Sequence, residues 1–208
     1  ALNLRFNPVV LDSKRLIEEY FARNINWALF QSSHYLPKWR PGQDYRRGYT
    51  ADIKTGGVML DIIHEFDLAN FLLGPAEVAF ASAKTSGQLE IPSEDSADII
   101  LDHGDKLTSS IHLDYITQPT RRCFSIGGVG GIMDVDLVAR SIKVFDADNN
   151  IKSEKTYKST NDDDYLLEME SFANCIKDNI RPKVSGLAAL EVLRQVLAAR
   201  KLAGISLS

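Results

Sequence analysis

Cysteine is scarce in this sequence of 208 residues, which holds only Cys123 and Cys175, far apart along the chain. The two thiols lack the C-x-x-C spacing of a structural zinc site and the density of a disulfide framework. They fit a reducing compartment, so we expect a cytoplasmic protein. Long apolar runs are also missing, because charges interrupt every hydrophobic tract well before the roughly 20 residues that a membrane helix needs. We therefore expect no membrane partner.

An excess of basic charge is missing too. The chain carries 24 Lys and Arg against 28 Asp and Glu, which gives a formal net charge of -4. A protein that binds nucleic acid usually presents a basic patch that neutralises phosphates. The composition therefore argues against a nucleic-acid partner.

Hydrophobic residues make up 44% of the chain, so residues 1–208 can form a single domain with a substantial core. The sequence starts without methionine, and Leu2, Leu4 and Phe6 alternate as they do in a strand. We expect a fragment or a processed product. Apolar residues within 11–24 recur at helical spacing and predict about three helical turns, with Asp12 or Ser13 as the N-cap.

The rest of the chain predicts an α+β fold. Residues 25–33 read as a strand, and residues 58–73 as an apolar helix that ends at Gly74-Pro75. From about residue 76 the pattern has period two, and the last two segments are helical. The expected strands are 77–84, 96–102, 106–115, 121–128, 131–137, 141–145 and 151–157, and the expected closing helices are 161–179 and 185–204, the second capped by Ser185.

Short links between successive strands imply antiparallel neighbours. We expect an open, mainly antiparallel β-sheet with helices packed on one face. Its other face needs a cover, and in 106–115 the residues Ile111 and Leu113 alternate with His112 and Asp114 to give one apolar and one mixed face. Self-association through the mixed face predicts a homodimer or homotetramer.

The helix 58–73 carries the first candidate for chemistry. Asp61 and His64 stand at i,i+3 and share a helix face, with Asp67 one turn further on. A carboxylate that fixes one imidazole nitrogen leaves the other free to exchange a proton, which suits a general base. The alternative is a solvated helix pair with no role in catalysis. Glu65 points about 100° away from His64, so we expect no metal site here.

The loop 34–57 is the second candidate, since loops of this length in compact domains are usually functional or disordered and aromatic residues argue against disorder. Guanidinium groups beside aromatic rings suit an anionic or hydroxyl-rich small ligand such as a sugar. A well-packed surface loop remains the alternative. The candidate substrate-binding residues are Trp39, Tyr45, Arg46 and Tyr49 in the loop, with Arg121 and Arg122 after "DYITQPT".

Glycine is concentrated in "GGVGG" at residues 127–131, but this cluster does not predict a cofactor loop. A dinucleotide fingerprint needs G-x-G-x-x-G between a strand and a helix. Here the sixth position from Gly128 is Met133, and another strand follows. The glycines predict a hairpin turn instead.

Several blocks together resemble the C-terminal domain of the Gfo/Idh/MocA oxidoreductase family, over nearly the whole chain. They are "NLRFNP", "YLPKWRPGQDYR", "TGGVMLDIIHEFDLANFLLG", "IHLDYITQPTRR" and "SGLAALEVLRQVLAARK". The resemblance implies hydride transfer between NAD or NADP and a sugar, sugar derivative or cyclitol, with His64 as the catalytic histidine. It implies a catalytic role for Asp61 as well, although this Asp stands three residues before the histidine, as in the shorter DxxHExD variant, where the family typically has four.

The same resemblance implies that the cofactor is bound mainly by an N-terminal Rossmann domain outside this sequence. Residues 1–8 would then be the strand that leaves that domain. On this view the isolated chain is inactive. The alternative is a non-catalytic module that binds a ligand or forms dimers without a cofactor domain.

Overall fold

The computed structural model describes residues 2–21 and 24–205. Residues 1, 22 and 23, which fall in the expected exit strand 1–8 and the expected helix within 11–24, lie outside the described residues. The helices are η1 (Asn3–Phe6), α1 (Pro8–Phe21), α2 (Leu36–Trp39), η2 (Tyr45–Arg47), η3 (Tyr49–Ala51), α3 (Val58–Asp61), α4 (His64–Leu73), α5 (Asn161–Asp178) and α6 (Gly186–Leu202). The strands are β1 (Ile25–Ser33), β2 (Glu77–Lys84), β3 (Ser96–Asp102), β4 (Thr108–Asp114), β5 (Arg121–Gly128), β6 (Gly131–Asp136), β7 (Ser141–Asp146) and β8 (Ile151–Thr156).

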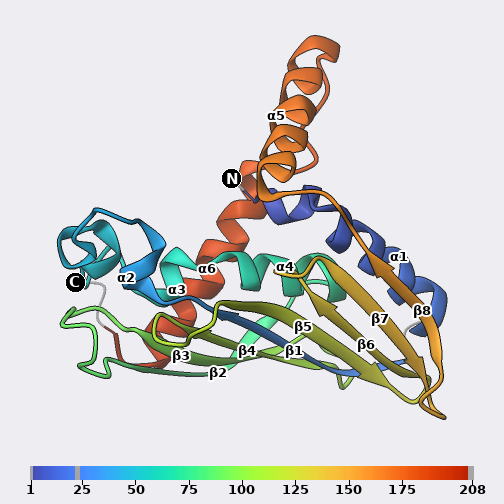
Figure 1. Cartoon of the computed structure of the whole chain (residues 1–208), viewed down its shortest axis with the longest axis horizontal. Helices are drawn as coiled ribbons and strands as arrows, with labels where there is room; N and C mark the ends of the chain where they lie inside the picture. The colour runs from blue at the N-terminus through green and yellow to red at the C-terminus, as the bar shows by residue number, and fades with distance from the viewer. Residues whose placement is uncertain (1, 22–23, 206–208) are drawn as a thin grey trace.

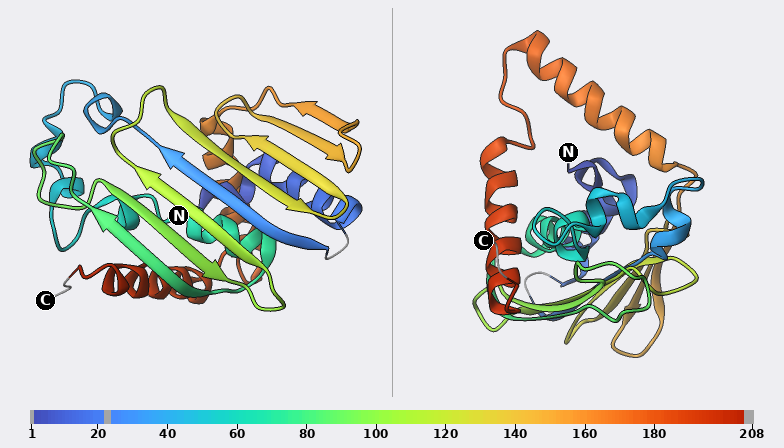
Figure 2. Two further views of the ribbon diagram at one scale, coloured as in Figure 1. Left: turned by 90° about the horizontal axis from the view of Figure 1, so that it is seen from below. Right: turned by 90° about the vertical axis from the view of Figure 1, so that its left-hand side faces the viewer.

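The strands form one open sheet in the order β2-β3-β4-β1-β5-β6-β7-β8. Neighbours pair antiparallel except β1 and β4, which run parallel. Helices α1, α4 and α6 lie over one face, and in the left view of Figure 2 no helix stands in front of the strands. The predicted α+β fold, with an open sheet and helices on one face, is confirmed.

The core lies between the sheet and these helices. Strand β4 contributes Ile111 and Leu113, both almost fully buried, and Phe66 of α4 and Met59 of α3 pack in the same cluster. Alternate residues of the strands face away from the helices, as a pleated strand requires. The predicted inward face of 106–115 is therefore confirmed.

Two expectations near the N-terminus are wrong. Residues 3–6 form the 3₁₀ helix η1 and not a strand. Helix α1 begins at Pro8, because the Asn7 side chain accepts a hydrogen bond from the Val9 N–H at 2.8 Å and proline suits the first helical position. Asp12 and Ser13 are thus inside the helix and do not cap it.

The glycine cluster forms the predicted hairpin between β5 and β6, with Gly128 opposite Gly131. A Cβ at Gly128 would lie 1.9 Å from the Asn24 carbonyl oxygen, and Gly131 has φ +135° with the Phe145 carbonyl oxygen equally close to its Cβ position. Close backbone approach explains these glycines.

Helix α5 projects away from the sheet (Figures 1 and 2). A capping box of Thr160 and Asp163 begins it, and Ser185 caps α6 as predicted. The N-terminal end of α5 is held by Asp164, which pairs with Arg140 and accepts a hydrogen bond from Asn7. Beyond that end, α5 presents apolar side chains to the outside. No helix among the described residues is long and apolar enough to cross a membrane.

Candidate active site

The predicted helix 58–73 is two helices, and the break lies between the two candidate catalytic residues. Helix α3 ends at Asp61 because Ile62 adopts φ -103° and ψ 40°, outside the helical region, and α4 begins at His64. Gly57 starts α3 with φ +90°, and a Cβ there would lie 2.2 Å from the Glu94 carboxylate. Only glycine fits this position without displacing Glu94.

Asp61 is held by two phenols and not by His64. Its Oδ1 accepts a hydrogen bond from the Tyr49 hydroxyl at 2.6 Å, and its Oδ2 accepts one from the Tyr115 hydroxyl at 2.9 Å. Burial and the neighbouring Asp61 raise the pKa of the Tyr115 phenol far above its usual value, so this residue stays a donor. The Arg40 guanidinium lies over the Tyr49 ring. The helix-face pairing of Asp61 with His64 that the spacing predicted is therefore not formed.

His64 is partly buried at the start of α4. Its Nδ1 is buried and has no hydrogen-bond partner among the described residues. Burial and the positive charge of Arg122 lower the pKa of His64 to about 4. The imidazole is therefore neutral near pH 7, which is the form that accepts a proton.

Arg122 forms an ion pair with Glu65, whose side chain is buried, and the Nε to Oε1 distance is 2.7 Å. In the sheet Arg122 stands beside Ser32 of β1, on the face that α4 covers. Arg121 is exposed, and strand alternation points it to the opposite face of the sheet. The structure thus brings Arg122 to His64 and does not bring Arg121 there.

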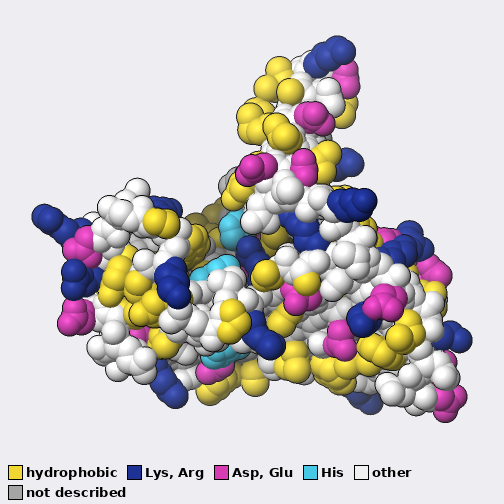
Figure 3. Space-filling view, viewed as in Figure 1, with side chains coloured by type: hydrophobic (Ala, Val, Ile, Leu, Met, Phe, Trp, Pro, Cys, Tyr) yellow, Lys and Arg dark blue, Asp and Glu magenta, His cyan; other side chains and the backbone are white. Residues whose placement is uncertain are grey.

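Two aromatic side chains of the loop, Trp39 and Tyr49, lie beside the residues described above. Trp39 lies 6.1 Å from the Tyr115 ring, centroid to centroid, and stacks on His34. Figure 3 shows histidine side chains in a hollow of the helix-covered side, between the lobe formed by the loop and the projecting α5. Of the loop candidates, Trp39 and Tyr49 therefore lie at the site.

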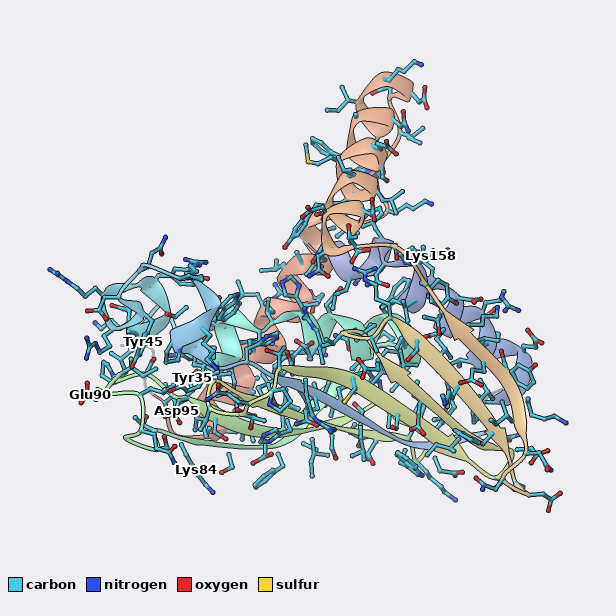
Figure 4. The ribbon with its side chains drawn as sticks, viewed as in Figure 1. Tyr35, Tyr45, Lys84, Glu90, Asp95 and Lys158 are labelled. Carbon is cyan, nitrogen blue, oxygen red and sulfur yellow. The ribbon has the colours of Figure 1, made fainter. Side chains whose placement is uncertain are left out.

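Tyr45 and Arg46 lie at the outer end of the loop. Figure 4 labels Tyr45 and Glu90 there, and Arg46 pairs with Asp44 and Glu90 at 2.9 Å each. Tyr45 packs partly against the core. No hydrogen bond among the described residues joins either side chain to Asp61 or His64.

The sequence did not single out Tyr115, Glu65 as an ion-pair partner, or His34. Tyr115 follows the inward face of β4, so the alternation that placed it in the core also aims its hydroxyl at α3.

Together the site offers a neutral imidazole, an oriented carboxylate, a cation and aromatic surface. This set can bind a hydroxyl group and exchange its proton.

A comparison with known protein families identifies one family. Residues 24–134 match the domain described as the GFO/IDH/MocA C-terminal domain. No curated protein sequence matches the chain.

Solved structures share the fold at low sequence identity. A levoglucosan dehydrogenase in complex with NADH and levoglucosan superposes with a TM-score of 0.85 and 16% identity, over 98% of this chain and 63% of that chain. An oxidoreductase from Agrobacterium radiobacter, in complex with NAD+, L-tartaric acid and magnesium, gives 0.78 and 21% over 97% and 61%. A UDP-N-acetylglucosamine 3-dehydrogenase from Acidithiobacillus ferrooxidans gives 0.74 and 17% over 98% and 61%. This chain therefore spans about three fifths of the length of those proteins.

Proposed function

Because the chain belongs to the GFO/IDH/MocA family and corresponds to its C-terminal domain, we propose that the whole protein is an NAD(P)-dependent oxidoreductase. It transfers hydride between the nicotinamide and a sugar, a sugar derivative or a cyclitol. The observation that carries this proposal is the neutral His64 imidazole beside Arg122, at the same helix junction as the doubly hydrogen-bonded Asp61.

In this proposal His64 is the general base. It takes the proton of the substrate hydroxyl while hydride leaves the carbon that bears it, or returns the proton in the reverse direction. Arg122 opposes a lasting positive charge on the imidazole, which favours passing the proton on.

Asp61 then acts on the substrate. Each of its oxygens already accepts one phenol, and each retains a lone pair for a substrate hydroxyl. Tyr49 donates to Asp61, Trp39 lies against the Tyr115 ring, and Arg122 acts on His64, so these three are the proposed substrate contacts.

Arg46 pairs with Asp44 and Glu90, and Arg121 lies on the opposite face of the sheet, so we leave both out of the proposed site. Tyr45 lines a small pocket with Trp39 but makes no hydrogen bond to Asp61 or His64, and we leave it out as well.

NAD or NADP supplies the chemistry of accepting or donating hydride. The glycine turn at 127–131 is filled by its own neighbours, with a Cβ at Gly128 only 1.9 Å from a carbonyl oxygen, so it cannot cradle a pyrophosphate. We therefore propose that a dinucleotide-binding domain precedes residue 1 and holds most of the cofactor against the wall that carries His64.

The exposed apolar side chains of helix α5 are evidence for a preceding domain. Tyr165, Met169, Phe172 and Ile176 recur at helical spacing, and each is more than half exposed. An apolar stripe of this length usually marks an interaction surface. The N-terminal end of the chain lies beside it, since the Leu2 N–H donates to Glu168 of α5 at 3.1 Å.

The open face of the sheet supports self-association with a second copy. Leu29 and Phe80 point outward there and are 52% and 51% exposed. They border a groove of about 660 Å³ that also contains His112 and Asp98. A homodimer or homotetramer would bury this mixed surface. The exposed apolar residues and the groove of this face also favour a second candidate function, a dimerisation or ligand-binding module without catalysis.

Binding of NAD+ and NADP+ measured by calorimetry separates the two functions. We expect no binding to the 208-residue chain, and binding with hydride transfer to or from a sugar for the polypeptide that includes the upstream domain. Micromolar binding of either dinucleotide to the 208-residue chain would contradict the proposal that a preceding domain holds most of the cofactor. An encoded protein that starts near residue 1 would favour the non-catalytic module.

A further inference from the structure

Several buried side-chain atoms around the start of α4 have no hydrogen-bond partner among the described residues. They are Ser32 Oγ, His64 Nδ1, Glu65 Oε2 and Arg122 Nη2. The other such atoms in the described part of the chain belong to the ion pair of Glu94 and Arg200, away from this place. Buried polar atoms are nearly always satisfied, by protein groups or by ordered water. Four of them at one place therefore require a common partner.

The four residues are neighbours where α4 lies over β1 and β5 (Figure 1). Ser32 of β1 and Arg122 of β5 are Cα partners in the sheet, so their side chains share its helix-covered face. Nε of Arg122 donates to Oε1 of Glu65 at 2.7 Å, which leaves Oε2 of the same carboxylate and Nη2 of the same guanidinium open. His64 directly precedes Glu65, and Arg122 is close enough to lower the pKa of its imidazole.

Two of these residues occupy positions where the fold would accept an apolar side chain. Ser32 continues the inward row of Ala28 and Phe30 along β1 and is 0% exposed. Glu65 is 1% exposed, next to the fully buried Phe66. A hydroxyl and a carboxylate cost free energy at such positions unless they are hydrogen-bonded. Packing alone thus does not explain them.

One water molecule can satisfy the whole set. Nη2 of Arg122 only donates, Oε2 of the Glu65 carboxylate only accepts, and the Ser32 hydroxyl can do either. A water that accepts from Arg122 and from an Nδ1–H of His64 can donate to Glu65 and Ser32, which uses all four of its hydrogen bonds. In this arrangement the ring hydrogen of His64 is on Nδ1, so Nε2 is the nitrogen that accepts a proton.

We propose that Glu65 and Ser32 are positioning residues for His64. Through one buried water they hold the ring hydrogen on Nδ1 and leave Nε2 free to take the substrate proton. Arg122 fixes the Glu65 carboxylate for this role through the bond to its other oxygen. The catalytic value of this tautomer rests on the proposed function, whereas the hydrogen-bonded cluster itself is a property of this chain alone.

Nitrogen-15 nuclear magnetic resonance of the labelled 208-residue chain reports the tautomer without cofactor or substrate. The measurement is made at pH 7, where His64 is neutral. We expect the Nδ1–H form of His64 to exceed the Nε2–H form by about tenfold or more, the effect of a hydrogen bond to a charged group. His103 is the internal reference, because its Nδ1 lies 2.9 Å from the Gly74 carbonyl oxygen and must carry the hydrogen there.

Two variants remove members of the cluster. Ser32→Ala deletes one hydroxyl and nothing else, so the fold should persist and the tautomer ratio should fall about three- to tenfold. Glu65→Gln keeps the shape but replaces the charged acceptor by an amide, and should lower the ratio at least as much. Ser33→Ala is the matched control, since Ser33 is equally buried but its Oγ accepts from Gln31 at 2.9 Å. If Glu65→Gln does not fold, Ser32→Ala decides.

A crystal structure of the chain tests the bridge itself. We expect one ordered water within hydrogen-bonding distance of Glu65 Oε2 and Arg122 Nη2. The proposal is overturned if no water joins these atoms, if His64 of the parent chain carries its hydrogen on Nε2, or if Ser32→Ala keeps the parental tautomer ratio.

Kinetics of the polypeptide with its upstream domain separate this proposal from the proposed function. Ser32→Ala should lower the turnover number and leave the Michaelis constant nearly unchanged. An Nδ1–H tautomer that responds to Ser32→Ala, in an enzyme whose His64→Ala variant turns over normally, would keep the cluster and remove the general base. Loss of turnover in His64→Ala, with the hydrogen of the parent on Nε2, would do the reverse.

Discussion

The hydroxyl of Tyr115 donates to Oδ2 of Asp61 over 2.9 Å, and this hydrogen bond joins the end of β4 to the end of α3. Tyr115 is fully buried, whereas Tyr49, which holds the other oxygen of Asp61, is 49% exposed. One oxygen of the Asp61 carboxylate is therefore held from inside the core by Tyr115. The other oxygen is held by the solvent-facing phenol of Tyr49.

The two phenols should contribute unequally to stability. We expect Tyr115→Phe to lower the free energy of unfolding by about 1–3 kcal/mol, since it removes the donor from a partly buried carboxylate. Tyr49→Phe should cost less than about 1 kcal/mol because water replaces its hydroxyl. Urea unfolding of both variants, alone and combined with Asp61→Ala, measures the coupling. Equal costs for the two substitutions would show that Tyr115 does not anchor Asp61.

Arg122 should control the protonation of two histidines. Its positive charge lowers the pKa of both His34 and His64, after burial as the larger cause. In Arg122→Met combined with Glu65→Gln, which avoids leaving an unpaired buried carboxylate, both pKa values should rise part of the way from about 4 toward 6.5. Histidine proton shifts followed over pH provide the measurement. Arg121→Met is the matched control, and a shift of the same size there would contradict the geometry.

These depressed pKa values also predict a loss of stability in acid. Between pH 6.5 and 4 the unfolded chain binds protons on His34 and His64 that the folded chain does not bind. The free energy of unfolding should therefore fall as pH is lowered through this window. His64→Gln should reduce the slope, and adding His34→Gln should reduce it further. Denaturation curves at several pH values test this, and an unchanged slope in the double variant would refute it.

Self-association through the open face is the fourth prediction. Sedimentation at high micromolar concentration should show a dimer or tetramer, and Leu29→Asp with Phe80→Asp should shift it toward the 23.2 kDa monomer. Val129 is 83% exposed but lies in the β5–β6 turn, so Val129→Asp is the matched control. A parent chain that sediments only as the monomer contradicts this proposal.

The strands were predictable because their signal is local. In 96–102 and 121–128 the period-two pattern, bounded by turn residues, locates β3 and β5 to the residue. The parallel pairing of β1 with β4 was not predictable in this way. It depends on which strands meet after the loop 34–57 and the helices that follow it, and that is decided by long-range packing.

The contacts of Asp61 were not predictable for a related reason. Ile62 and Ile63 continue the apolar pattern of 58–73, so nothing in the sequence marks the break at Ile62. Once α3 ends there, Asp61 turns to the phenols of residues 49 and 115, which are 12 and 54 positions away in the chain. Residue spacing identified both His64 and Asp61 as candidates but could not show what each contacts.

We propose that His64 moves the substrate proton, and steady-state kinetics of His64→Ala in the polypeptide with its upstream domain measure this role. We expect a turnover number lowered by roughly 10²–10⁴-fold, the usual effect of losing a general acid or base, with dinucleotide affinity nearly unchanged. Asp61→Asn should give a smaller loss and a shifted pH profile. A His64→Ala enzyme that turns over its sugar at a near-normal rate would show that His64 is not the general base.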